Sequence, residues 1–132
     1  MLYEDRVNLS KLRLESAKEL LEVSKMNLNN GFYKSAANRS YYAIFSAMRA
    51  VLALDGFDSK KHAGIISEFR KKYIKTGIFD SSLSNIITDL FEARQNSDYN
   101  DFYVVFKNDV LEQNKQASFF IVTVERYLNS KY

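Results

Sequence analysis

The sequence predicts an all-α protein, a bundle of about five helices in a single domain covering residues 1–132. The chain has no proline and only four glycines, so little in it interrupts a long helix. Apolar residues recur every three or four positions, which is the spacing of one helix face. The one strand-like run, "FYVVF", is short and has no obvious sheet partner. No sheet is therefore expected.

The first predicted helix runs from about Asp5 to Asn29. Its apolar face advances by three and four residues, which predicts burial of one side. "NNGF" ends it, and Gly31 suits the left-handed conformation that follows many helices. The residues of the buried face are Leu14, Ala17, Leu21, Ser24 and Leu28.

The second predicted helix, Tyr33 to Leu54, is apolar almost all round. One face carries only small residues, so another backbone can approach it closely: Ala36, Ser40, Ala43, Ala47 and Ala50. The polar residues fall into one narrow stripe: Ser35, Arg39, Tyr42, Ser46 and Arg49. A helix that is polar along one stripe is typical of the buried centre of a bundle. The two arginines of the stripe then need a polar groove and paired charges, because a bare buried arginine is very costly.

Three more helices complete the predicted bundle. A short one covers about His62 to Tyr73, a fourth runs from about Leu83 to Tyr99, and Asn108 is expected to cap a fifth that reaches about Asn129. The fourth carries the apolar line Leu83, Ile87, Leu90 and Phe91. The fifth has the predicted core face Leu111, Ala117, Ile121, Val124 and Leu128.

The composition excludes several classes of site. There is no cysteine, hence no disulfide, thiolate metal site or cysteine nucleophile, and a single histidine makes a metal centre implausible. No metal and no cofactor is expected. The first ten residues lack the features of a signal peptide. No run approaches the roughly 18 apolar residues of a membrane span, so a cytoplasmic location is expected. A net charge of +3 permits an acidic partner without requiring one.

Arg94 and Asp98 are the most informative polar pair outside the second helix. They lie one turn apart and continue the apolar line of the fourth helix. One interpretation is a local salt bridge, although the acid stands at the unfavourable end of the helix. The other is a shared polar pocket with Arg39 and Tyr42, in which a guanidinium fork suits phosphate.

Two further features allow two interpretations each. His62, in "SKKHAG", is either a solvated or capping residue at a helix start or a proton-transfer group. The basic run "FRKKYIK", residues 69–75, is either a hydrated helix face or a source of attraction for RNA or DNA phosphates.

Several motifs together resemble a HEPN domain (higher eukaryote and prokaryote nucleotide-binding), most closely the small stand-alone prokaryotic members. They are "ANRSYYAIF" on the second helix, "KHAG" before the third, "FRKKYIKTG", and "RQNSDY" at the end of the fourth. The order and spacing of these motifs cover nearly the whole chain. The resemblance implies an up-and-down helical bundle that pairs as a homodimer.

The resemblance also implies a function. Many such proteins are toxin-like and are encoded beside a minimal nucleotidyltransferase. Many others are metal-independent endoribonucleases with an R-x(4–6)-H motif. The chain is accordingly expected to act in a toxin–antitoxin or defence-like module with a nucleotidyltransferase partner. The alternatives are an endoribonuclease with an atypical R-x4-Y site, or a module that binds RNA or a nucleotide without catalysis.

This sequence departs from the family motif in two places. Counting from Arg94, the histidine position holds Tyr99 and the motif tyrosine position holds Asp101. A tyrosine, with an ordinary pKa near ~10, is a poor general base at neutral pH. The candidate catalytic residues are Arg94, Asp98 and Tyr99. The candidate binding residues are Arg39, Tyr42, Arg49 and His62. Arg39 or Tyr42 is expected to contact Asp98 directly.

Overall fold

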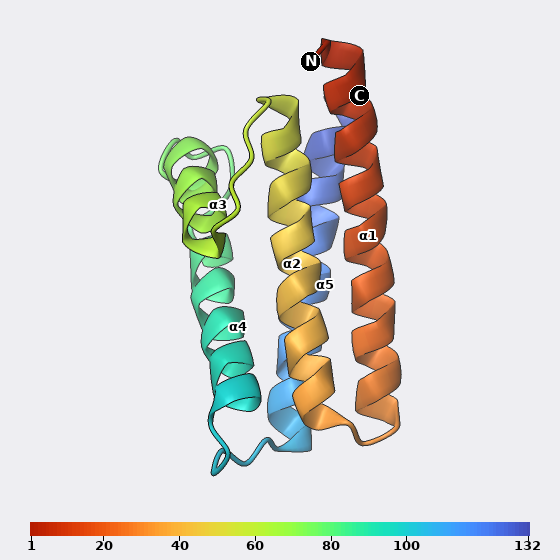
Figure 1. Cartoon of the computed structure of the whole chain (residues 1–132), viewed down its shortest axis with the longest axis vertical. Coiled ribbons are helices and arrows are strands. Elements are labelled where there is room, and N and C mark those ends of the chain that lie inside the picture. Colours follow the sequence, from red (N-terminus) through yellow and green to blue (C-terminus); the bar gives the residue numbers. More distant parts are fainter.

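The computed structural model describes residues 1–132 and contains five α-helices and one π-helix, with no strand. The elements are α1 (Tyr3–Asn29), α2 (Tyr33–Leu54), α3 (His62–Phe69), η1 (Arg70–Ile74), α4 (Ser82–Tyr99) and α5 (Lys107–Asn129). The long helices run alternately down and up, and both termini lie at the same end (Figure 1). The expected all-α, up-and-down bundle is confirmed.

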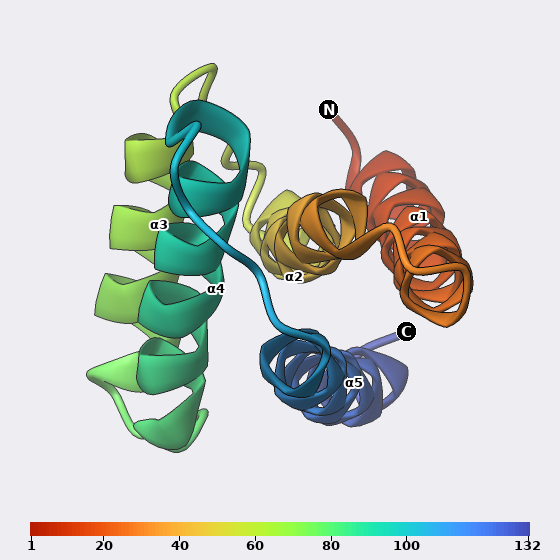
Figure 2. The same cartoon turned by 90° about the horizontal axis from the view of Figure 1, so that it is seen from below.

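Helix α2 is the centre of the bundle. Seen along the helices, it lies between α1, α5 and the α3–α4 pair (Figure 2), and it packs against all four. Thirteen of its 22 residues are buried, which agrees with its narrow polar stripe. None of the helices is both long enough and apolar enough to span a bilayer.

The small-residue face of α2 is covered by α1 within the same chain. Two buried serines of α1 reach backbone carbonyls of α2: Ser10 Oγ donates to Ala50 O at 2.7 Å and Ser24 Oγ donates to Ala36 O at 2.8 Å. Short side chains on both helices permit this approach, as predicted. The same face therefore cannot also hold a second copy of the chain.

Ala47→Leu is expected to lower the free energy of unfolding by ~1–3 kcal/mol, because three extra carbons must fit where the alanine is fully buried. Urea or thermal unfolding measures the loss. Ala63→Leu makes the same change at an exposed position of α3 and should stay within about 0.5 kcal/mol. Equal stability of both variants and the original chain would mean that α1 and α2 are not closely packed at Ala47.

The third predicted helix differs from the structure in its second half. The chain leaves α geometry at Arg70 and forms η1, where Lys75 N–H donates to Arg70 O at 2.9 Å. Two side chains of this wider turn form hydrogen bonds to neighbouring parts of the chain. Arg70 donates to Ser84 and Thr88 of α4, and the Tyr73 hydroxyl donates to Asp55 Oδ2 at 2.7 Å. Periodicity alone does not distinguish a π turn from an α turn over five residues.

Helix α5 begins at Lys107, two residues earlier than an Asn108 cap implies; Asn108 therefore lies inside the helix, the predicted cap was wrong, and no side chain caps α5. Val110 is buried there, whereas Leu111 is 37% exposed. The assignment of Leu111 to the core was therefore wrong, and the other four predicted core residues of this helix are buried. The strand-like run before it forms no strand.

Candidate functional site

Arg94 occupies the inner side of α4, facing α2. It continues the line of Ile87 and Phe91 by about one turn, so the helix directs its side chain toward the bundle. Only 14% of the Arg94 side chain and 25% of the Asp98 side chain are exposed. A cation with so little exposure to water needs several hydrogen-bonding or charged partners.

The guanidinium group of Arg94 has four hydrogen-bond acceptors. Its Nε donates to Asp98 Oδ2 at 3.0 Å, and its Nη2 donates to the hydroxyls of Tyr42 and Tyr99 at 2.9 and 3.3 Å. Its Nη1 donates to Gln95 Oε1 at 3.2 Å. A guanidinium has five N–H donors, so one on Nη1 remains for a ligand.

Three tyrosine rings surround the same guanidinium. The Arg94 carbon Cζ lies 5.7 Å from the ring centre of Tyr41 and 5.3 Å from those of Tyr42 and Tyr99. Rings at this distance attract a cation through their negative faces. The hydrogen bonds and the rings together hold Arg94 in one orientation. The structure thus brings Arg94, Asp98, Tyr42 and Tyr99 together.

The prediction that Asp98 contacts Arg39 or Tyr42 was wrong, because Asp98 contacts Asn38 and Arg94 instead. Asn38 Nδ2 donates to Asp98 Oδ2 at 2.7 Å, and Tyr42 bonds to Arg94 instead. Arg39 is exposed and makes no hydrogen bond or ion pair. It lines a shallow pocket of about 160 Å³ together with Asp98. Successive helix residues differ by about 100° in direction, which places Asn38 inward and Arg39 at the rim.

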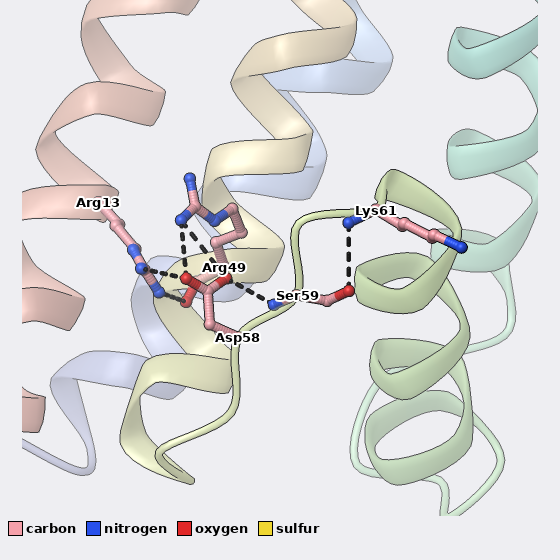
Figure 3. Close-up of polar contacts among 5 residues, drawn as sticks. All are labelled: Arg13, Arg49, Asp58, Ser59 and Lys61. Atoms are coloured by element: carbon pink, nitrogen blue, oxygen red, sulfur yellow. Dashed lines mark hydrogen bonds and ion pairs between the residues drawn. The ribbon is translucent and has the colours of Figure 1, made fainter.

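Arg49 lies almost three turns beyond Arg39 along α2 and belongs to a different cluster. Its Nη2 donates to Asp58 Oδ2 at 3.2 Å, and Arg13 of α1 donates to the same oxygen at 3.2 Å. Figure 3 shows both arginines pointing toward this carboxylate, which also accepts a hydrogen bond from the backbone of Ser59. Although partial burial opposes it, hydrogen bonds from Ser59 and Arg49 and the charges of both arginines lower the pKa of Asp58. This cluster anchors the segment between α2 and α3.

His62, the first residue of α3, lies against the aromatic side chains beside Arg94. Its Nδ1 is 3.0 Å from the hydroxyl of Tyr41, and its ring stacks on Phe45 with centres 4.2 Å apart. It contacts the Tyr42 ring edge to face at 5.6 Å. His62 and Arg94 therefore share two neighbours, Tyr41 and Tyr42.

Burial lowers the pKa of His62, and the positive charges of Arg94 and Arg49 lower it further. The imidazole is therefore neutral at pH 7. Its Nε2 makes no hydrogen bond within the chain. The residue also lines a groove of about 820 Å³ between α3, η1 and α4.

The pKa of His62 is expected to lie below its ordinary value of 6.5. NMR titration of the ring protons is unambiguous because the chain has one histidine. Since the unfolded chain takes up the proton more readily, stability should decrease as pH falls from about 6.5 to the lower folded-state pKa. Arg94→Ala should raise the pKa of His62, whereas Arg126→Ala on the exposed side of α5 should not. A pKa of 6.5 or above would contradict the geometry.

Sequence reasoning missed four residues of these clusters: Arg13, Asn38, Tyr41 and Asp58. Asn38 and Tyr41 lie within the "ANRSYYAIF" motif, but Tyr41 has the periodicity of a core residue and neither was assigned to the site. Arg13 and Asp58 carry no motif that separates them from ordinary surface residues. No group of three or more histidine, cysteine, aspartate or glutamate side chains lies close enough to hold a metal ion.

Comparison with known proteins identifies the family. A "UPF0332 protein" of Thermotoga maritima is 30% identical over 112 residues, which are 85% of this chain and 85% of the relative. The Methanocaldococcus jannaschii protein named "Putative toxin MJ0142" is 32% identical over 118 residues, 89% of this chain and 80% of the relative.

Solved structures give the same fold. The crystal structure of TT1696 from Thermus thermophilus superimposes with a TM-score of 0.77 at 17% identity, covering 90% of this chain and 98% of that one. The family described as the HEPN domain matches residues 10–127. That range includes every helix that builds the Arg94 site, and the chain therefore belongs to the HEPN domain family.

Proposed function

We propose that this chain is the toxin-like HEPN component of a two-component toxin–antitoxin or defence-like module. It works as a homodimer with a minimal nucleotidyltransferase partner, in the cytoplasm. Two relatives from Methanocaldococcus jannaschii carry the name "Putative toxin". The observation that carries the proposal is the orientation of Arg94 by four hydrogen bonds and three aromatic rings.

The chemistry of the Arg94 site suits a phosphate group. A preoriented guanidinium binds phosphate oxygens through directed N–H donors, and one donor of Nη1 is free. Arg39 stands exposed at the rim beside Asp98 and adds a mobile positive charge. The phosphate belongs to RNA or to a nucleotide that the partner handles.

Growth of a bacterial host tests this proposal. Induced expression of the chain should stop growth, and Arg94→Ala should restore colony formation at equal protein level. Arg126→Ala, an arginine removed from the exposed side of α5, is the matched control and should remain toxic. Co-expression of a nucleotidyltransferase encoded by the adjacent gene should restore growth. Toxicity that is unchanged by Arg94→Ala would refute a role for this site.

A second candidate function is RNA cleavage without a metal ion, and the position of His62 favours it. The family motif places a histidine after the arginine, and here His62 approaches the same tyrosine pair from α3. In the tautomer whose Nδ1–H donates to the Tyr41 hydroxyl, Nε2 is the basic nitrogen of the neutral imidazole and can accept the proton of a ribose 2′-hydroxyl. Lys71 and Lys75 line the adjoining groove and favour an RNA backbone. Purified protein should then cleave RNA in EDTA, and intact RNA would exclude this function.

A further inference from the structure

The connection between α4 and α5 exposes an unusual amount of apolar surface. Tyr99, Phe102, Val104 and Phe106 are between 64% and 95% exposed, and Phe32 in the α1–α2 turn is 63% exposed. Both connections lie at the same end of the bundle (Figure 1). Exposed apolar surface of this extent on a folded domain marks an interaction site.

Part of the backbone of the same connection is unpaired, although Tyr103 N–H donates to Asn100 O and Phe106 O accepts from the N–H groups of Asp109 and Val110. Residues 103–106 belong to no helix or turn, and the N–H groups of Val104, Val105 and Phe106 donate to no carbonyl of the chain. Val105 packs inward beside the small cluster of Leu28, Ala36 and Val110. Its neighbours Val104 and Phe106 face outward. This alternation and the free backbone groups are those of an edge strand that lacks its neighbour.

The sequence of the segment is complementary to itself in the antiparallel direction. If Val104 lies on a two-fold axis, Phe102 stands opposite Phe106. Tyr103 then stands opposite Val105. Beyond the end of the ladder, Asp101 in the preceding turn comes beside Lys107, the first residue of α5 in the other copy. Opposite charges and aromatic pairs across an antiparallel ladder are favourable, and a two-fold interface requires this self-complementarity.

We propose that residues 102–106 pair antiparallel with the same segment of a second copy of this chain, with Val104 on the two-fold axis and with Asp101 and Lys107 flanking the ladder. The inference rests on the homodimer of the proposed function and assigns its surface. The small-residue face of α2 is already covered by α1, so it cannot form the dimer interface. The four exposed apolar residues of the α4–α5 connection offer on the order of 600 Å² per chain, close to the ~800 Å² per partner of a standard interface.

This pairing also places the two Arg94 sites in relation to each other. Tyr99, which accepts a hydrogen bond from Arg94, is three residues before the paired segment. Each site therefore lies at the edge of the shared interface. Phe102 lies in a turn closed by a bond from Tyr103 N–H to Asn100 O at 3.1 Å, and its ring meets Phe106 of the partner copy at the end of the ladder.

A single cysteine tests the axis, because the chain has none of its own. The free N–H groups of Val104 and Phe106 point at the partner strand only if Val104 forms a hydrogen-bonded pair with its copy. In such a pair the Cα atoms lie ~5.5 Å apart, within the range that a disulfide spans. Oxidised Val104→Cys should therefore run at twice the 15.3 kDa of the chain. Val122→Cys, at an exposed valine on α5, should stay at 15.3 kDa. Sedimentation at micromolar concentration should show that Val104→Glu halves the mass of the original dimer, while Val122→Glu leaves it unchanged.

Charge reversal tests the register. Asp101→Lys and Lys107→Asp should each weaken the dimer, and the double variant should restore it. A dimer that Val104→Glu leaves intact and Val104→Cys does not cross-link would overturn this interface, although the homodimer itself would stand. A chain that sediments as a monomer would overturn both. Growth inhibition that depends on Arg94 is measured separately, so it distinguishes a wrong interface from a wrong function.

Discussion

Tyr41→Ala is expected to lower the free energy of unfolding by about 3–5 kcal/mol, the usual cost of emptying a large aromatic site in a core. The Tyr41 side chain is fully buried. Its ring stacks on Phe45 at 6.0 Å and meets Phe91 edge to face at 5.8 Å. No neighbour can fill the cavity without leaving another partner, because α2 is enclosed by four other helices.

Tyr41→Phe separates packing from hydrogen bonding. Burial raises the pKa of Tyr41 to about 12, so the hydroxyl stays protonated at any pH of interest. Removing it leaves His62 Nδ1 without its partner and should cost only about 1 kcal/mol. Chemical denaturation of both variants measures the difference. If the alanine variant unfolds no more easily than the phenylalanine variant, Tyr41 does not hold α2, α3 and α4 together.

The helices could be predicted from the sequence because their periodicity is strong and their ends are marked. Gly31 has a φ of 80° at the end of α1, the left-handed conformation expected there. The wrong assignment of Leu111 departed from this periodicity. Seven residues, or two turns, before Ala117 is Val110 and not Leu111, and Val110 packs beside Leu28 and Ala36.

The candidate site was predicted in part. The apolar line of α4, continued beyond Phe91, implied a polar cluster, and its members do meet: Arg94, Asp98, Tyr42 and Tyr99. Their functional roles remain predictions. Arg49 does not join them, because its Asp58 partner lies in a connection whose course the periodicity of the helices does not determine. That pairing also explains how a helix at the centre of the bundle tolerates Arg49.

Arg94→Ala is expected to lower the rate of any RNA cleavage in EDTA by about 10²–10³-fold, the usual cost of removing one preorganised donor to a developing negative charge. Arg94→Lys should recover little of that rate. A lysine keeps the charge but loses the planar fork, and the hydroxyls of Tyr42 and Tyr99 would no longer orient it. Initial rates on a labelled RNA, with Arg126→Ala as the control, measure both effects.

Stability should change much less than the cleavage rate. Asp98 retains Asn38 and is partly exposed to water, so the loss of its arginine should cost only about 1–2 kcal/mol. A folded Arg94→Ala protein with lost cleavage therefore identifies Arg94 as a group that acts on the phosphate. Cleavage at the original rate, or a protein that unfolds altogether, would instead assign Arg94 to holding α4 against α2, with the phosphate bound elsewhere.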